Sequence, residues 1–230
     1  TRLRCDWSSD VCSSDLYADN DRLWDASKDI VNAQLADLNL VALYTCPWPG
    51  QGFYFNKEVT SSADTQGVKF RSYNTATATF AESLGMIPVQ IEAAELSQAL
   101  ATGVAEAFIS SGSTGYDRKV WESLSHYYKV NAWLPRNYVM VNKGIWDALD
   151  SGVQAQVQQA ADETGADCSA KSADLANWYF EQLEANGMIV EDAGPEFLAE
   201  LQAIGVKMTA DWLEATGADG QAILDAYNAN

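Results

Sequence analysis

The 230-residue sequence is poor in the residues on which most catalytic and metal sites depend. It contains one histidine, His126, and four cysteines, two of which lie within the first 16 residues. The motifs HExxH, GxSxG, CxxC and GxxxxGK[ST] do not occur, and no GxGxxG fingerprint is complete. These absences argue against zinc proteases, hydrolases with a nucleophile elbow and nucleotide-binding folds. The sequence implies no metal and no cofactor.

Positive charge is scarce as well. Fourteen lysines and arginines stand against 32 aspartates and glutamates, which gives a formal net charge of -18. Such a chain is repelled by phosphate backbones and by anionic bilayers, so we expect no nucleic-acid partner. No run approaches the 18 apolar residues that a membrane-spanning helix needs, so we expect no membrane insertion. With 47% apolar residues the chain can still bury a sizeable core.

The first 16 residues, TRLRCDWSSDVCSSDL, differ from the rest of the chain. They show no amphipathic period, and they lack the apolar core and cleavage site of a signal peptide. The segment resembles translated adapter sequence, with a natural disordered tail as the alternative, and we exclude it from the fold. Cys5 and Cys12 therefore do not count as part of a disulfide framework. The remaining pair, Cys46 and Cys168, is left open because nothing local indicates whether the two join.

From residue 17 onward, apolar runs alternate with amphipathic stretches in the rhythm of an α/β sheet. Strands are predicted over residues 39–44, 53–55, 68–73, 87–91, 104–110, 128–135 and 138–142. Helices are predicted over residues 18–38, 75–84, 92–103 and 153–185, followed by two shorter helices, one opening at Pro195 and one carrying Trp212. The stretch SGSTG at 111–115 is predicted to be a flexible loop.

Arginine offers the one candidate site that the residues themselves suggest. Outside the first segment the chain has only four arginines: Arg22, Arg71, Arg118 and Arg136. Arg71 ends a predicted strand, directly before a polar turn and a helix that Asn74 is expected to cap. A guanidinium at a strand end beside a helix N-terminus is suited to holding a carboxylate through two hydrogen bonds. An ordinary structural or surface ion pair is the alternative interpretation of Arg71.

Three segments carry a resemblance to a known family: QGVKFRSYNTAT, AAELSQALATGVAEAF and NAWLPRNYVMVN. Over residues 17–230 the chain resembles the solute-binding proteins of tripartite ATP-independent periplasmic (TRAP) transporters, of the C4-dicarboxylate-binding (DctP) type. The family pattern matches Gly67–Arg71, Asn74, Gly85–Val89 and Ala99–Ala107. Glu106 and Ala107 depart from it, because the family has Asp-Gly at these two positions.

The resemblance implies an α/β, periplasmic-binding-protein-like fold, in which two α/β domains close on the ligand and a long helix spans both. On that plan, residues 1–16 are a non-native tail, 17–47 the remainder of domain I and 48–123 domain II. The chain then returns to domain I over 124–152, forms the spanning helix over 153–185 and ends in C-terminal helices over 186–230. The first part of domain I and the signal peptide have no counterpart, which implies an N-terminally truncated fragment.

The resemblance also implies a binding site. The strand-end arginine of the family forms a salt bridge to the substrate carboxylate, which transfers to Arg71, and the family asparagine three residues later transfers to Asn74. Some sialic-acid-binding members carry a second arginine where this chain has Gln51, so sialic acid is disfavoured. A further pocket position of the family falls near Ser110 and Ser111.

Aromatic residues complete the predicted site. Tyr73, Trp48 and Trp133 are candidates to line the cleft, with burial in a core as the alternative for Trp133. Aromatic side chains around a single arginine favour an aromatic or keto monocarboxylate over a polyhydroxy diacid. The implied function is that of a periplasmic receptor that captures a small organic carboxylate and delivers it to TRAP membrane permease subunits, without catalysis.

The rival class is a carboxylate-processing enzyme, such as a lyase or hydrolase, on a similar two-domain scaffold. An enzyme of this kind requires a general base within reach of the bound carboxylate. The candidates are His126, Glu92, Glu95 and Glu106, and none of them sits in a convincing catalytic constellation. A third interpretation, a carboxylate sensor domain, finds no supporting feature in the residues.

Overall fold

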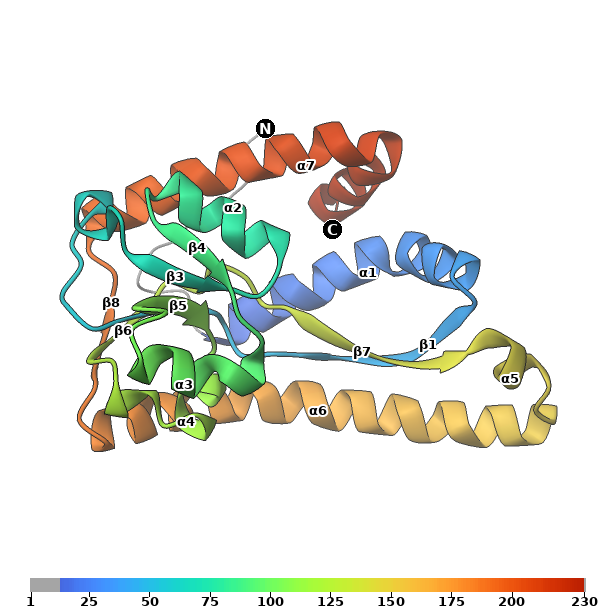
Figure 1. The fold of residues 1–230 in the computed structure, drawn as a ribbon. Coiled ribbons are helices and arrows are strands. Elements are labelled where there is room, and N and C mark those ends of the chain that lie inside the picture. The colour runs from blue at the N-terminus through green and yellow to red at the C-terminus, as the bar shows by residue number, and fades with distance from the viewer. Residues whose placement is uncertain (1–12, 230) are drawn as a thin grey trace. The chain divides into compact units, whose positions relative to one another are not determined.

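The structure is a computed structural model that describes residues 13–229. The chain divides into two compact units. Unit 1 consists of residues 13–48, 134–174 and 211–229 of the described chain, and unit 2 of residues 49–133 and 175–210. Two long helices, α6 (Ser151–Ala185) and α7 (Pro195–Ala229), each contribute to both units (Figure 1). The predicted tail lies outside the described residues up to residue 12, and helix α1 already begins at Ser13.

Unit 2 is built on a six-stranded sheet with the strand order β4-β3-β5-β2-β6-β8. The strands are β2 (Gly52–Phe55), β3 (Lys69–Ser72), β4 (Ile87–Gln90), β5 (Ala107–Ser110), β6 (His126–Lys129) and β8 (Ile189–Asp192). Strand β2 is antiparallel to both of its neighbours, and the other five strands run parallel to one another. The carboxyl ends of those five strands therefore share one edge of the sheet with the amino end of β2.

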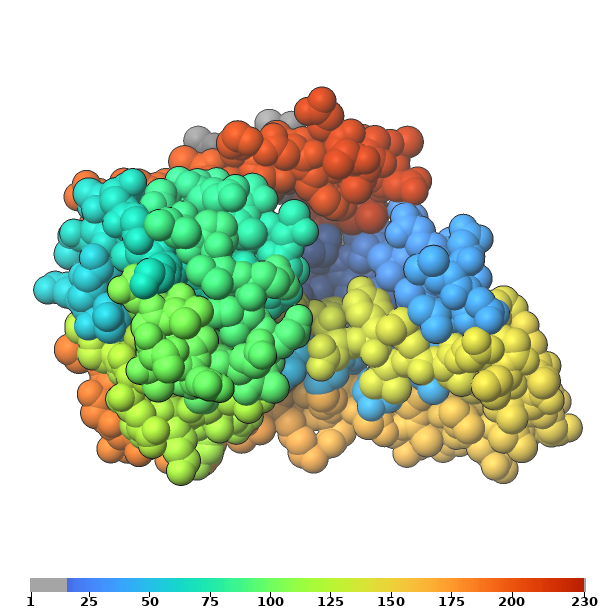
Figure 2. Space-filling model, viewed as in Figure 1, coloured from blue at the N-terminus to red at the C-terminus, as the bar shows by residue number. Residues whose placement is uncertain are grey.

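Helices cover both faces of this sheet (Figure 1). They are α2 (Thr75–Ser83), α3 (Leu96–Ala101), α4 (Gly112–Asp117) and parts of α6 and α7, with short 3-10 turns at η1 (Ser62–Thr65), η2 (Ala93–Glu95) and η3 (Val120–Glu122). In the space-filling view, residues 49–133 form one dense mass, coloured cyan to green (Figure 2).

The core of unit 2 is aromatic and lies on both sides of β2. On one face, the ring of Phe53 stacks on Phe80 at 5.7 Å and approaches Phe197 at 5.8 Å. On the other face, Tyr54 stacks on Phe108 with 4.4 Å between ring centroids. A strand buried on both faces reads as a continuous apolar run, which accounts for the sequence GFYF.

Two predictions about unit 2 were wrong. The predicted flexible loop 111–115 forms helix α4, whose Gly115 lies so close to the Tyr54 hydroxyl that any side chain there would overlap it. The predicted strand 128–135 ends at Lys129, because Asn131 adopts a left-handed φ of 44° and the chain leaves the sheet.

Unit 1 contains a two-stranded antiparallel sheet of β1 (Leu40–Pro47) and β7 (Arg136–Asn142). Helices α1 (Ser13–Asp37) and α5 (Lys143–Asp147) and parts of α6 and α7 complete the unit. The Tyr17 hydroxyl donates a hydrogen bond of 3.0 Å to the carbonyl oxygen of Ser172 and so joins α1 to α6. A disulfide between Cys46 and Cys168, with 5.7 Å between the Cα atoms, joins β1 to α6.

The division of the chain differs in two places from the predicted plan. The return to the first unit, predicted at residue 124, lies at Leu134, because β6 pairs with β2 and β8 inside unit 2. The two predicted C-terminal helices form one element, α7, which is interrupted at Gly217 (φ 58°, ψ -126°) and not between Ile204 and Trp212. None of the helices within residues 13–229 combines the length and apolarity needed to cross a membrane.

Candidate functional site

The carboxyl edge of the unit 2 sheet brings together most of the residues that the sequence suggested. This edge carries Arg71 and Tyr73 at the end of β3, Ser110 at the end of β5, Gln51 before β2 and Trp133 after β6. The backbone N–H of Gln51 donates to the Trp133 carbonyl oxygen at 3.1 Å, and Gly52 pairs with Ser110 in the sheet register. In open α/β sheets, ligands bind outside the carboxyl ends of the strands.

Arg71 is buried at this edge, with 5% of its surface exposed. Its Nε donates a hydrogen bond of 2.8 Å to the carbonyl oxygen of Ile91, the residue after β4. Within residues 13–229, no aspartate or glutamate forms an ion pair with Arg71, and its two Nη groups have no hydrogen-bond partner. The site thus presents a buried cation whose outer donors are available to an anion.

The electrostatics of Arg71 agree with this geometry. Burial lowers the pKa of the Arg71 guanidinium, and the charges of Tyr73 and Glu92 act in the opposite direction. The Arg71 guanidinium carbon lies 5.1 Å from the centre of the Tyr73 ring, within the range of a cation–π contact. A buried charge without a partner is unfavourable, so binding of a carboxylate here would remove a cost that the empty site carries.

Three aromatic rings extend the site beside Arg71. The indole Nε1–H of Trp133 donates to the Tyr73 hydroxyl oxygen at 3.1 Å. The Trp133 ring packs edge-on against Phe80 of α2, with 5.5 Å between the centroids. Trp133 is half-buried, so it belongs neither wholly to the core nor to the surface. The sequence predicted Tyr73 and Trp133 as site residues but gave no sign of their hydrogen bond.

The polar candidate residues differ in whether their side chains are free to bind a ligand. The Asn74 side-chain oxygen caps α2 by accepting from the Thr77 backbone N–H at 2.9 Å, which is the predicted helix cap. Gln51 is 4% exposed, and its Nε2 donates to the Pro49 carbonyl oxygen at 3.2 Å. Ser111 is fully buried, and its hydroxyl lies 2.7 Å from that of Ser113. The Ser110 hydroxyl has no hydrogen-bond partner in the described chain.

Trp48 stands apart from this set because it belongs to unit 1. Its backbone N–H donates to the Pro135 carbonyl oxygen at 2.8 Å. The residue is 38% exposed.

The four residues considered as catalytic bases do not form one cluster, although the charge of Glu92 does act on Arg71. His126 begins β6, and Glu106 precedes β5, so both lie at the amino edge of the parallel strands, opposite to Arg71. The His126 Nδ1 is 2.8 Å from the Ser125 hydroxyl. Glu92 and Glu95 lie beyond the end of β4 and are exposed. In the part of the chain that the structure describes, no three His, Cys, Asp or Glu side chains are placed to hold a metal ion.

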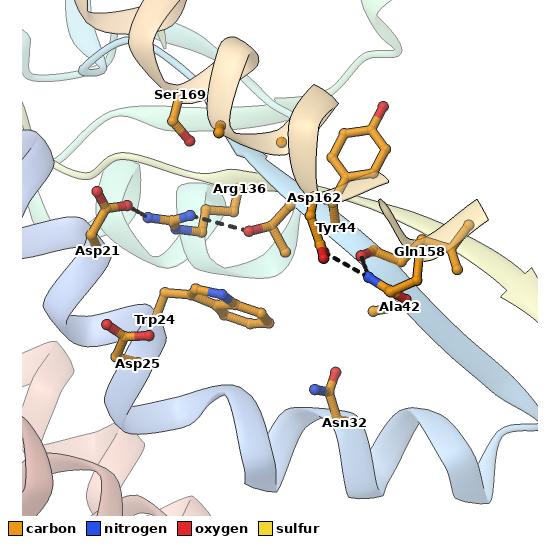
Figure 3. A pocket seen from close by; sticks show the side chains of 14 residues that line it. Asp21, Trp24, Asp25, Asn32, Ala42, Tyr44, Arg136, Gln158, Asp162 and Ser169 are labelled. Carbon is orange, nitrogen blue, oxygen red and sulfur yellow. Dashed lines mark hydrogen bonds and ion pairs between the residues drawn. The ribbon is translucent and has the colours of Figure 1, made fainter. Parts of the chain in front are cut away.

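Unit 1 contains a cavity of about 570 Å³ between α1, β1 and α6 (Figure 3). A second arginine, Arg136, points into it with 9% of its side chain exposed. This guanidinium pairs with Asp21, and its Nη1 donates to the Thr45 hydroxyl at 3.1 Å. Asp25 and Asp162 also line the cavity. Because the cation is already neutralised and further carboxylates surround it, this cavity is unsuited to a carboxylate ligand.

The comparison with known proteins decides the family. The model for "bacterial extracellular solute-binding protein, family 7" (DctP) matches residues 20–215. This chain belongs to that family. A crystal structure of a marine metagenome TRAP solute-binding protein, described as specific for pyroglutamate and holding co-purified pyroglutamate, is 77% identical. The match covers 96% of this chain and 72% of that one, with a TM-score of 0.92.

Two Bordetella pertussis extracytoplasmic solute receptors that bind pyroglutamic acid are also similar to this DctP-family chain. DctP6 is 38% identical, covering 96% of this chain and 73% of its own, and DctP7 is 34% identical, covering 95% and 72%. Both have a TM-score of 0.91. The predicted family and the periplasmic-binding-protein-like fold are confirmed. The protein is a periplasmic TRAP solute receptor and not an enzyme, which removes the carboxylate-processing alternative.

Proposed function

We propose that this receptor binds pyroglutamate, or a very similar small cyclic monocarboxylate, with Arg71 as the counter-ion of the carboxylate. The observation that carries the proposal is the buried Arg71 guanidinium, which lacks an acidic partner in the described chain. The three similar receptors, at 77%, 38% and 34% identity, are all described with pyroglutamate or pyroglutamic acid. The proposed ligand is therefore an acid with a saturated lactam ring. The aromatic side chains alone had favoured an aromatic or keto acid.

The chemistry of pyroglutamate suits the groups at the carboxyl edge of the sheet. Its carboxylate matches the free Nη donors of Arg71, and its ring methylenes match the faces of Tyr73 and Trp133. Its lactam N–H and carbonyl need one acceptor and one donor, which the polar side chains at this edge can supply. Ligand sites of this kind combine apolar walls with a few placed polar groups.

The proposed role in transport is delivery of the bound acid to a TRAP membrane permease. Support for this partner comes from family membership. The receptor's contribution is capture from a dilute solution: the ligand replaces water around a buried cation, and an ion pair in such a site is favourable only when both partners are present.

Replacing Arg71 with alanine tests the proposal. We expect Arg71→Ala to weaken pyroglutamate binding by roughly 30-fold or more, since loss of one partner of a buried charge pair costs about 2–5 kcal/mol. Isothermal titration calorimetry and ligand-induced thermal shift provide the measurements. The matched control is Arg118→Ala, because Arg118 is an exposed arginine of the same unit.

The ligand supplies a second control. Pyroglutamic acid amide keeps the ring and loses the charge, so it should bind the wild type weakly and should lose little further on Arg71→Ala. Wild-type affinity for pyroglutamate in the Arg71→Ala variant would overturn the assignment of the counter-ion. Absence of any binding of cyclic carboxylates to the wild type would overturn the proposed ligand.

A further inference from the structure

The Tyr73 hydroxyl accepts one hydrogen bond but donates none within the described residues. The oxygen accepts the Trp133 Nε1–H at 3.1 Å, and the described residues offer no acceptor for the hydroxyl proton. Tyr73 is half-buried, so the group is within reach of a ligand. A polar proton left unpaired beside a buried cation points to a ligand acceptor at this position.

The surrounding contacts hold that hydroxyl in place. The Trp133 ring packs edge-on against Phe80, and the Trp133 backbone carbonyl oxygen accepts a hydrogen bond from the Gln51 backbone N–H. The indole N–H therefore comes from a fixed ring and occupies one lone pair of the Tyr73 oxygen. With that lone pair occupied, the hydroxyl proton is confined to directions away from Trp133.

The hydrogen-bond inventory at Arg71 identifies which ligand atom this proton would meet. Nε is already used by the Ile91 carbonyl oxygen, so the two Nη groups are the donors left for a carboxylate. A guanidinium and a carboxylate pair through two parallel hydrogen bonds, which occupy both carboxylate oxygens. The acceptor of pyroglutamate that then remains is the lactam carbonyl. The Tyr73 ring centre lies 5.1 Å from the guanidinium carbon, so Tyr73 and Arg71 are neighbours and one small ligand can contact both.

We propose that Tyr73 is a specificity-determining residue whose hydroxyl donates a hydrogen bond to the ring carbonyl of the ligand, and that Trp133 is the positioning residue that aims it. The inference rests on the proposed function, because it places the carboxylate of the ligand on Arg71. It adds the ligand class: cyclic monocarboxylates with a carbonyl in the ring are preferred over those without one. A site built to hydrogen-bond a polar ligand group discriminates against the analogue that lacks the group.

Two ligands that differ only in the carbonyl isolate this contact. The probes are 3-oxocyclopentane-1-carboxylate and cyclopentanecarboxylate, titrated by calorimetry into the wild type, Tyr73→Phe and Trp133→Phe. We expect the wild type to prefer the oxo acid. Tyr73→Phe keeps the ring and removes the hydroxyl, so it should reduce that preference, taken as the ratio of the two affinities, by about tenfold, the effect of one neutral hydrogen bond.

Trp133→Phe keeps an aromatic ring against Phe80 and removes the indole N–H. It should lower the ratio of the affinities for the oxo acid and the carbonyl-free acid, because any loss of packing against the ring methylenes affects both acids alike and cancels in the ratio. Thermal unfolding of both variants without ligand checks that they fold. Equal weakening of both acids by Tyr73→Phe would mean that Tyr73 contacts the carboxylate, and an unchanged preference would mean that it contacts neither group; either result overturns the inference.

The outcomes also separate this inference from the proposed function. If the wild type binds pyroglutamate and Arg71→Ala abolishes binding, but the preference survives in Tyr73→Phe, only the role of Tyr73 falls. If the wild type binds no cyclic carboxylate, both proposals fall together.

Discussion

At the scale of single residues, Arg71 and Arg136 show how the surroundings of an arginine decide its role. Arg136 has Asp21 as an ion-pair partner, while Arg71 has a backbone carbonyl and an aromatic ring. The sequence alone does not distinguish these two arginines, because it does not show which groups surround each of them. No carboxylate of the described chain forms an ion pair with Arg71, so under the proposed function its charge is available to the ligand. The Ile91 contact also fixes the guanidinium before binding, so less side-chain entropy is lost when the ligand arrives.

Gly52 offers a prediction at the same scale. Its missing side chain makes room for the Tyr128 carbonyl oxygen and the Tyr127 ring, so Gly52→Ala forces buried atoms apart. We expect a loss of unfolding free energy of about 1–3 kcal/mol, measured by urea denaturation. Gly194→Ala is the control, because the new methyl would meet no atom within 4 Å. Equal urea midpoints for the two variants would contradict this account.

At the scale of elements, the Cys46–Cys168 disulfide joins β1 to the middle of α6 inside unit 1. A link between residues separated by 122 positions restricts the unfolded chain strongly. Reduction, or replacement of both cysteines by serine, should therefore lower the unfolding free energy by between about 2 and 5 kcal/mol. Urea unfolding with and without dithiothreitol provides the measurement.

The matched control for the disulfide replaces Cys5 and Cys12, which lie outside the described residues. That variant should keep its sensitivity to dithiothreitol, while Cys46→Ser/Cys168→Ser should lose it. A wild type that unfolds identically with and without reductant would show that the pair is not joined. Formation of the bond suits the periplasmic location of the receptor.

Elements with a clear hydrophobic period were predicted well from the sequence. The expected helix 153–185 is α6, Ser151–Ala185, and the expected strand 68–73 contains β3. Errors arose where tertiary contacts override local preference. The glycines of 111–115 indicated a loop, yet in α4 they allow close packing, Gly112 against Tyr179 and Phe180 and Gly115 against Tyr54. The disulfide joins positions far apart in the sequence, so no local pattern could indicate it.

In the candidate site, too, local features could be predicted from the sequence and contacts between distant residues could not. Arg71 was accessible to sequence reasoning because a strand end and a helix start flank it within a few residues. The contact between Tyr73 and Trp133 was not, because 60 positions separate them and only the sheet order brings their loops together. The sequence likewise could not show that the Arg71 Nη groups lack hydrogen-bond partners, because this depends on which side chains the fold places next to them.

At the scale of the whole molecule, the net charge of -18 predicts a dependence of stability on salt. Repulsion among like charges disfavours the compact state, and dissolved ions screen it. Raising sodium chloride from about 10 mM to about 0.5 M should therefore raise the thermal unfolding midpoint, as measured by differential scanning calorimetry. Sucrose, which strengthens burial without screening charge, serves as the control. A midpoint that falls as salt is added would contradict the prediction.

The division of the chain has a consequence for how the protein matures. Unit 1 is assembled from three separate stretches, the last of which is 211–229, whereas unit 2 needs nothing beyond residue 210. As the chain enters the periplasm from its N-terminal side, unit 2 can therefore become complete while unit 1 still lacks residues 211–229. Contacts between distant stretches form slowly. We expect the sheet edge that carries Arg71 to be mature before unit 1.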